Sequence, residues 1–262
     1  VKDFYRTDFD CSGFDRIQVP GHIQIQGYDE MMYINTQYPW DGTEFLRPPH
    51  ISEEYNPVGS YVTFFELDEQ LKGKPVSISF QGVEVAFYLW LNGHFVGYSE
   101  DTFTPSEFQL DDYLVEGENK LAVEVYKRSS ASWIEDQDFW RFSGIFRDVY
   151  ILSRPEGHLV DIDITTENNT ITAAFAGTAT VTLLEGDRVL ETQKAENKAV
   201  FTVKQPKLWN AEQPHLYTLR FESCGECITQ KVGFREIAMN DAGQLLINGV
   251  SVRLYGVNRH DT

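Results

Sequence analysis

The stretch Ala86-Phe87-Tyr88-Leu89-Trp90-Leu91-Asn92-Gly93-His94-Phe95-Val96-Gly97 decides the class of fold. Two apolar runs flank an Asn-Gly pair, which is the strongest short-range signal for a tight turn between antiparallel strands. Short runs rich in β-branched and aromatic residues recur on both sides of it, with turn residues between them, at 61–67, 76–80, 120–126 and 148–152. The sequence therefore predicts an all-β chain that begins with an antiparallel sandwich.

A second unit follows the Pro- and Gly-containing linker 153–157. Its composition shifts toward Thr, Val and Ala, and apolar and polar residues alternate at 160–164, 179–183 and 200–203. Evenly spaced short strands of this kind indicate an immunoglobulin-like sandwich, although no Cys…Trp…Cys pattern is present. We expect domains at 1–154 and 155–236.

The last segment, 237–262, differs from both. Residues 245–250 predict a small hairpin, and 252–257 predict a short apolar strand that ends in Asn258-Arg259-His260-Asp261. Polar residues at the carboxyl end of a buried strand are the arrangement that α/β barrels use for their chemistry. We expect this segment to be the start of a third domain.

Composition excludes several classes of function. The chain has 262 residues, 42% of them hydrophobic and 14% aromatic, which is enough to fill a core and excludes general disorder. Its formal net charge of −18 repels phosphate backbones and anionic lipid, so nucleic acid and membranes are not expected partners. No apolar run approaches the roughly 20 residues that span a bilayer, and the first residues do not form a signal peptide. We expect a soluble protein whose true N-terminus is missing.

The three cysteines, Cys11, Cys224 and Cys227, are too few for a disulfide framework. The Cys-Gly-Glu-Cys spacing leaves metal or redox chemistry open, but no second pair exists. Alternating residues on both sides of the motif favour a hairpin with Gly225-Glu226 as its two-residue turn.

Residues 132–147 bring carboxylates, arginines and aromatic rings together without a helical or strand period, which predicts an irregular loop. Aromatic faces beside carboxylates suit a sugar, whose C–H faces stack on rings while its hydroxyls need acceptors. The same composition also fits a buried ion-pair plug between loops. A second ordered loop is expected at 18–48, where Pro, Gly, Tyr and Asn are dense.

Five segments together resemble, in order, the N-terminal third of the family 2 β-galactosidases. They are Val19-Pro20-Gly21-His22 leading into Gly27-Tyr28-Asp29, the segment 35–39, the run from Glu135-Asp136-Gln137-Asp138 to Arg147-Asp148, Gly233-Phe234-Arg235-Glu236, and Gly256-Val257-Asn258-Arg259-His260. The resemblance implies a galactose-binding-like jelly-roll sandwich, an immunoglobulin-like sandwich and the first strand of a truncated (β/α)8 barrel. It also implies a cytoplasmic enzyme that hydrolyses β-D-galactosides with retention and assembles as a homo-oligomer, with β-glucuronides as the other substrate class.

The resemblance also assigns roles to three residues. Asn35 matches an asparagine that reaches the galactose pocket, Asp138 matches an aspartate that binds galactose hydroxyls and ligates sodium, and His260 matches a histidine that contacts the sugar. Without the resemblance, Asn35 would be a turn cap, Asp138 a partner of Arg141 or Arg147, and His260 a cap on the barrel. A second divalent site of some members is not expected here, because Ser130 stands where they have an aspartate.

Catalysis itself is expected outside this chain. A retaining glycosidase needs two carboxyl groups roughly 5 to 5.5 Å apart, and nearby arginines would keep both carboxylates of a Glu135–Asp138 or Asp136–Asp138 pair ionised. In the resembled family the two catalytic glutamates and a Mg²⁺ site lie beyond Thr262, so no catalytic residue and no cofactor is expected in this segment alone, and Mg²⁺ and Na⁺ are expected in the full-length enzyme. Two other interpretations remain open: a free-standing carbohydrate-binding module, and a pair of sandwiches that serves subunit assembly.

Overall fold

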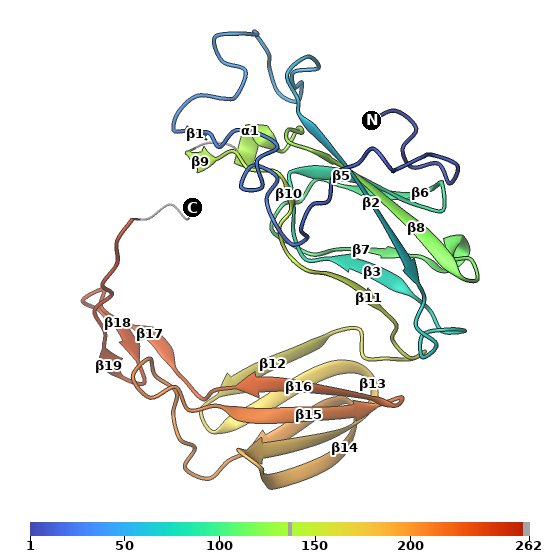
Figure 1. Cartoon of the computed structure of the whole chain (residues 1–262). Helices are drawn as coiled ribbons and strands as arrows, with labels where there is room; N and C mark the ends of the chain where they lie inside the picture. Colours follow the sequence, from blue (N-terminus) through green and yellow to red (C-terminus); the bar gives the residue numbers. More distant parts are fainter. Residues whose placement is uncertain (136–137, 259–262) are drawn as a thin grey trace. The chain divides into compact units, whose positions relative to one another are not determined.

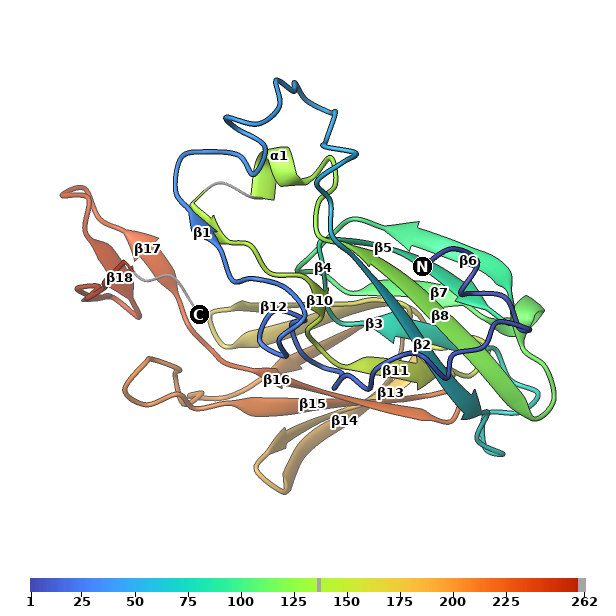
Figure 2. The same ribbon diagram turned by 45° about the horizontal axis from the view of Figure 1, so that its top comes forward.

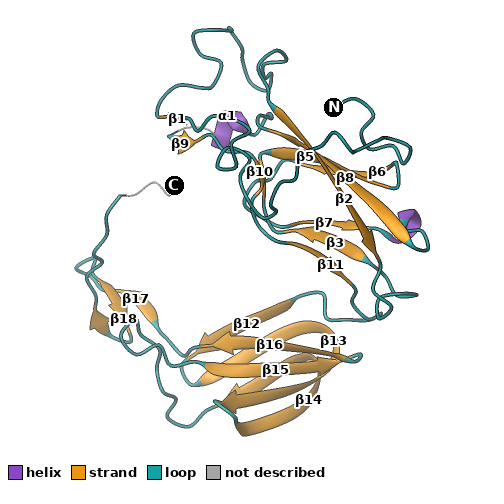
Figure 3. Ribbon diagram, in the orientation of Figure 1, coloured by secondary structure: helices purple, strands orange, loops and turns teal. Residues whose placement is uncertain are grey.

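The structure is a computed structural model, and it describes residues 1–135 and 138–258. The chain divides into two compact units, of which the first is Val1–Ser153 and the second begins at Arg154. Strands and loops make up nearly all of both units, and the helical segments among the described residues are one turn each (Figure 3). No helix in the described ranges is long and apolar enough to cross a membrane. The predicted all-β class is confirmed.

Two antiparallel sheets form the sandwich of the first unit (Figures 1 and 2). The larger sheet has the order β2 (Val58–Glu66), β8 (Glu118–Tyr126), β5 (Ala86–Leu91) and β6 (His94–Ser99). The smaller sheet has the order β11 (Val149–Leu152), β3 (Ser77–Phe80) and β7 (Ser106–Gln109), and the 3₁₀ turn η1 (Asp111–Tyr113) follows it. The strands expected at 61–67, 76–80, 86–91, 120–126 and 148–152 are therefore confirmed to within a few residues.

The core of the first unit lies between these sheets. Successive residues of a strand point to opposite faces, so alternate positions of β5 and β8 meet alternate positions of β3 and its neighbours. Burying this apolar surface supplies most of the unit's stability, at about 25 cal/mol per Å². The largest side chains of this core are Ile78, Phe80, Phe87, Leu89, Leu91, Leu110, Leu121 and Ile145.

The Asn92-Gly93 turn joins β5 to β6 as predicted. Asn92 and Gly93 have φ values of 51° and 83°, the left-handed conformation that a two-residue hairpin turn requires. The Asn92 side chain also forms hydrogen bonds with residues outside the turn. Its amide donates to Tyr113 O at 2.9 Å and to Asn119 Oδ1 at 2.8 Å, and its Oδ1 accepts from Lys120 N at 2.9 Å.

The second unit is a five-stranded antiparallel array (Figure 1). Its strands are β12 (Ile162–Glu167), β13 (Thr170–Glu185), β14 (Arg188–Thr202), β15 (Tyr217–Ser223) and β16 (Glu226–Val232). β13 and β14 are longer than the sequence suggests, and their register shifts between Ala174 and Thr178 around Gly177, whose φ is 102°. This bulge divides β13 in two, so that its first part pairs with β12 and its second part pairs with β15.

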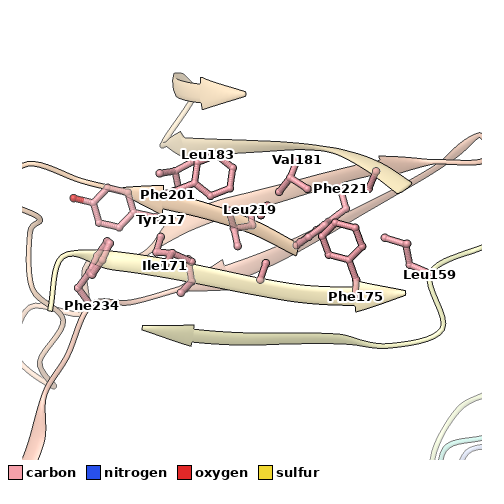
Figure 4. Packing of buried hydrophobic residues seen from close by; sticks show 14 residues of the cluster. Leu159, Ile171, Phe175, Val181, Leu183, Phe201, Tyr217, Leu219, Phe221 and Phe234 are labelled. Carbon is pink, nitrogen blue, oxygen red and sulfur yellow. The ribbon is translucent and has the colours of Figure 1, made fainter. Parts of the chain in front are cut away.

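Aromatic and branched side chains fill the core of the second unit (Figure 4). Phe201, Phe221, Phe234 and Tyr217 are all at most 2% exposed, and Tyr217 packs edge-on against Phe234 with ring centroids 5.3 Å apart. At the start of the unit, Arg154 donates from Nε and Nη2 to the two carboxylate oxygens of Glu226, each at 2.8 Å. This bidentate pair ties the expected linker to β16.

The cysteine motif does form a hairpin, but the expected turn was wrong by one residue. Ser223 pairs with Glu226, so the turn is Cys224-Gly225, with φ values of 48° and 82°, and not Gly225-Glu226. The physical reason is that glycine suits the second position of this turn, as it does in Asn92-Gly93. The cysteines are free thiols, and the described residues contain no group of three or more His, Cys, Asp or Glu able to hold a metal.

A small three-stranded sheet ends the described chain. It consists of β17 (Ile237–Met239), β18 (Leu245–Ile247) and β19 (Val250–Ser251), and Asn248 and Gly249 form the expected hairpin turn with φ values of 53° and 77°. The strand expected at 252–257 is not formed, and residues 252–258 carry no regular structure. A parallel barrel strand needs hydrogen-bonded neighbours on both sides, and among the described residues this segment has only the bond from Val252 N to Leu245 O at 3.0 Å.

The Asn92 network predicts a strong effect of Asn92→Ala. The substitution removes three hydrogen bonds, leaves the buried Asn119 amide partly unsatisfied and places alanine at a positive φ, so the first unit should lose about 2–4 kcal/mol of unfolding free energy. Hydrogen–deuterium exchange measured separately over the two units checks this. The matched control is Asn168→Ala, since Asn168 has the same φ of 51° and no side-chain hydrogen bond among the described residues; an equal loss for both variants would contradict the prediction.

The Arg154–Glu226 pair predicts a pH-dependent component of stability. The hydrogen bond from Arg154 lowers the pKa of Glu226 in the folded state, so this component is present above the unfolded-state pKa of about 4.3 and is lost as the pH falls through the lowered value. Glu226→Gln should therefore remove about 0.5–1 kcal/mol at pH 7 and flatten the stability profile below pH about 4.3. Denaturant unfolding between neutral and acid pH checks this, with Glu222→Gln on the same hairpin as the control; identical pH slopes for Glu226→Gln and the parent would refute it.

Candidate functional site

The 132–147 segment is more regular than its sequence suggests. It begins with the helical turn α1 (Ser132–Glu135) and contains the short strands β9 (Phe139–Trp140) and β10 (Gly144–Ile145). β9 pairs with β1 (Tyr33–Ile34), placing Tyr33 opposite Trp140 and Ile34 opposite Phe139 (Figure 1). The two loops singled out in the sequence, 18–48 and 132–147, are thus joined by a two-stranded ladder.

Asn35 and Asp138 lie together at the end of this ladder. The amide of Asp138 donates to the carbonyl of Asn35 at 2.7 Å, and both side chains are exposed. Asp138 has a φ of 54°, a left-handed conformation that aspartate tolerates better than most residues. The structure therefore brings together two of the three residues to which the sequence assigns sugar contacts.

Tyr33 is a site residue that the sequence analysis missed. Its hydroxyl donates a hydrogen bond to Oδ1 of Asp138, and this bond raises the pKa of Tyr33, so the hydroxyl stays protonated as a donor. Tyr33 opens β1, and Asn35 directly follows that strand. The pairing of β1 with β9, which brings Tyr33 to Asp138, could not be predicted from the local sequence.

Three aromatic rings, those of Tyr38 and Trp40 from the 35–50 loop and of Trp133 from α1, pack together. Trp40 is completely buried, and its ring centroid lies 4.6 Å from that of Trp133 and 5.9 Å from that of Tyr38. The Trp133 indole donates to His50 O at 2.8 Å, and the Tyr38 hydroxyl donates to Trp133 O at 3.1 Å. These contacts hold the long loop that follows Asn35 against α1.

The arginines of the loop bind backbone carbonyls. Arg141 is 3% exposed; its amide donates to Met32 O at 2.7 Å and its guanidinium to Gln37 O at 3.4 Å. The Arg147 guanidinium donates to Phe103 O at 2.8 Å and to Gln81 O at 3.3 Å. Both side chains therefore hold neighbouring loops in place.

Two further polar residues in or next to this loop have hydrogen-bond partners. Glu135 accepts from the Thr102 hydroxyl at 2.8 Å, and Ser130 donates to both carboxylate oxygens of Glu100 at 2.9 Å. Asp136 lies outside the described residues, as does His260, so the sugar contact expected of His260 stays a prediction.

The Val19-Pro20-Gly21-His22 segment supports the other end of the loop. Gly21 N donates to Ile145 O at 2.8 Å, and the His22 ring stacks between Phe142 and Phe146 with centroids 4.5 and 5.1 Å away. Burial in this stack lowers the pKa of His22. Gly144, with a φ of 124°, is required here, because a Cβ would lie 3.0 Å from Gly21 O.

The buried side-chain amide of Gln24 also holds the 18–48 loop against the 132–147 loop. Gln24 donates to the Ser143 hydroxyl at 2.8 Å and accepts from the Ser143 amide at 2.9 Å. Its amide also donates to Asp29 Oδ2 at 2.9 Å, and Asp29 pairs with the buried Lys127 at the end of β8. A satisfied buried network of this kind fixes one arrangement of the chain, because any partner left unpaired would be costly.

Comparison with known proteins agrees with this arrangement. Residues 4–155 match the sugar binding domain of the glycosyl hydrolases family 2, and residues 148–235 match a second family 2 domain. The chain is 53% identical to a β-galactosidase of Clostridium acetobutylicum, 47% to one of Halalkalibacterium halodurans and 43% to a β-galactosidase large subunit of Leuconostoc lactis. These matches cover 99–100% of this chain but only 28–47% of the relatives' length.

Solved structures show the same fold at low sequence identity. A β-glucuronidase from Bifidobacterium dentium matches 73% of this chain and 41% of its own with a TM-score of 0.65 at 23% identity. One from Lactobacillus rhamnosus matches 79% of this chain and 40% of its own with a TM-score of 0.65 at 21% identity. With both domain models matched in order and relatives at about half identity along its whole length, this chain belongs to the glycosyl hydrolases family 2.

Proposed function

We propose that this chain is part of an enzyme that hydrolyses β-D-galactosides, and that Asn35 and Asp138 form one wall of its galactose pocket. The observation that carries the proposal is the ladder that joins the exposed Asn35 to the exposed Asp138 through a 2.7 Å backbone hydrogen bond. Relatives that are 53% and 47% identical and named β-galactosidases support the substrate class.

The chemistry of the two side chains suits a galactose ring. An ionised carboxylate accepts hydrogen bonds from vicinal hydroxyls, and an amide offers both a donor and an acceptor. The Tyr33 hydroxyl donates a hydrogen bond to Oδ1 of Asp138, and this bond limits the rotation of the carboxylate. Its role is to position Asp138 for the sugar.

Bond cleavage is assigned to carboxyl groups outside this chain. A retaining mechanism needs one nucleophile and one acid with a raised pKa, roughly 5 to 5.5 Å apart. Glu135 and Asp138 each accept a hydrogen bond from a hydroxyl, of Thr102 and of Tyr33, and neither is assigned the role of nucleophile or acid. In this proposal 237–262 is the start of the catalytic barrel, His260 adds a sugar contact, and the isolated chain is inactive.

A cation at Asp138 is part of the same proposal. Sodium and other hard cations take oxygen ligands, and the exposed carboxylate of Asp138 can supply one. The remaining ligands, and those of a Mg²⁺ site, would come from the rest of the full-length protein.

Charge favours a galactoside over a glucuronide as the substrate. A uronate group would bring a second carboxylate toward the exposed Asp138, and like charges repel. The full-length protein should therefore hydrolyse a chromogenic β-galactoside far faster than the matching β-glucuronide. A preference for the glucuronide would overturn the proposed substrate class.

Asp138→Asn in the full-length protein tests the role of the carboxylate. Hydrogen bonds to charged groups contribute about 1.5–3 kcal/mol, so kcat/KM for a chromogenic galactoside should fall about ten- to a hundredfold. Asp148→Asn is the matched control, because Asp148 accepts a tyrosine hydroxyl, that of Tyr150, at 2.9 Å in the same unit. Unchanged kcat and KM for Asp138→Asn would leave this part of the chain only a structural role.

Tyr33→Phe tests the positioning role separately. Loss of the hydroxyl leaves the Asp138 carboxylate in place but less restrained, so KM should rise about three- to tenfold while kcat changes less. Tyr150→Phe, which removes the hydroxyl of the Tyr150–Asp148 pair, should leave both constants unchanged. Steady-state kinetics that show equal effects of the two substitutions would argue against the assignment.

A further inference from the structure

A concave surface lies on the larger sheet of the first unit. It is a groove of about 510 Å³, a volume within the range of about 300–1,000 Å³ typical of ligand sites. Its floor carries the rings of Tyr88 from β5, Tyr98 from β6 and Tyr126 from β8. None of Tyr33, Asn35 and Asp138 lines it.

The three tyrosines share one face of the sheet because of its register. Tyr88 stands directly opposite Tyr98, and their ring centroids are 4.7 Å apart; the Tyr126 ring lies 5.7 Å from that of Tyr88. The alternate residues Phe87 and Leu89 point into the core. The rings of Tyr98 and Tyr126 are inclined by 42° and 71° to that of Tyr88, so the three form an aromatic floor that is not flat, on the side of the sheet away from the core.

Two of the tyrosine hydroxyls on the floor donate to carboxylates, and the Arg128 guanidinium also lines the groove. The Tyr98 hydroxyl donates to Glu100 at 2.8 Å, and the Tyr126 hydroxyl donates to Glu124 at 3.0 Å. Burial, followed by the bond to Glu124, raises the pKa of Tyr126 to about 12, so its hydroxyl remains neutral at ordinary pH. The Tyr88 hydroxyl has no hydrogen-bond partner within 1–135 and 138–258, which leaves it available to a ligand.

The chain closes only part of this face. At the other end of β5, Tyr5 stacks on Trp90 with centroids 5.0 Å apart and an interplanar angle of 12°. Over the tyrosines no such cover exists among the described residues, and Tyr98 is 42% exposed. The segment 49–56 forms a wall of the groove instead, through Pro49, Ile51, Ser52, Glu53 and Asn56.

We propose that this groove binds a neutral saccharide, at a site separate from Asn35 and Asp138. Aromatic floors stack on the C–H faces of sugar rings, and the carboxylates of Glu53 and Glu100 at the rim can accept from sugar hydroxyls. The groove lining carries these two carboxylates and one guanidinium, that of Arg128, on a chain of net charge −18, and this balance disfavours anionic ligands such as phosphates and uronates. The site does not depend on the proposed hydrolysis, since it uses none of the residues assigned to the galactose pocket.

Saturation-transfer NMR of the 262-residue chain with lactose and with cellobiose tests the proposal. We expect a saturable signal from at least one of the two disaccharides, with the Kd raised about tenfold in Tyr98→Ala. Tyr150→Ala is the matched control, because Tyr150 is 48% exposed and also donates to a carboxylate two residues away. It should bind as the parent does.

Two more variants keep the test decisive. Glu100→Gln preserves the shape of the rim while removing an acceptor charge, so it should weaken binding even if Tyr98→Ala does not fold. Asp138→Asn should leave this binding unchanged. The proposal is overturned if neither disaccharide gives a signal, if Tyr98→Ala and Glu100→Gln bind as the parent does, or if Asp138→Asn removes the signal. Turnover by the full-length protein, which tests the hydrolase assignment, is a separate measurement.

Discussion

The ladder between β1 and β9 is the constraint on which the candidate site depends. It holds only two residue pairs, and an isolated ribbon of that length is not stable in water. Its position is therefore set by what surrounds it. Trp40, in the loop that follows β1, packs against Trp133 of α1, and the amide of the buried Arg141 donates to Met32 O, directly before β1.

The sandwich core and the buried polar network act together to hold this arrangement. Apolar burial between the two sheets stabilises the first unit without specifying where its loops lie. Buried hydrogen bonds fix where the loops lie. Gln24 bonds Ser143, which is 119 residues away in the sequence, and Asp29 bonds Lys127, which is 98 residues away. The aromatic stack around His22 fills the space next to this network.

Local signals in the sequence were sufficient for much of the fold. Asn92-Gly93 and Asn248-Gly249 predicted their turns because the required left-handed angles are a property of those residues. The Cys224-Gly225 turn was placed one residue late because two overlapping dipeptides both contain Gly225. Long-range features were less accessible: Tyr33 meets Asp138 across 105 residues, and nothing local to either residue indicates the pairing.

The separation in sequence between contacting residues also affects the order in which parts of the chain fold. In the second unit, β12, β13 and β14 are consecutive in the sequence and pair as neighbours, so their contacts close short loops. The Tyr33–Asp138 contact closes a loop of about a hundred residues, at a higher entropic cost. Local contacts of this kind form quickly and distant ones slowly. The contact between Tyr33 and Asp138, in the candidate site, should thus be among the last features to form during folding, well after the hairpins of the second unit.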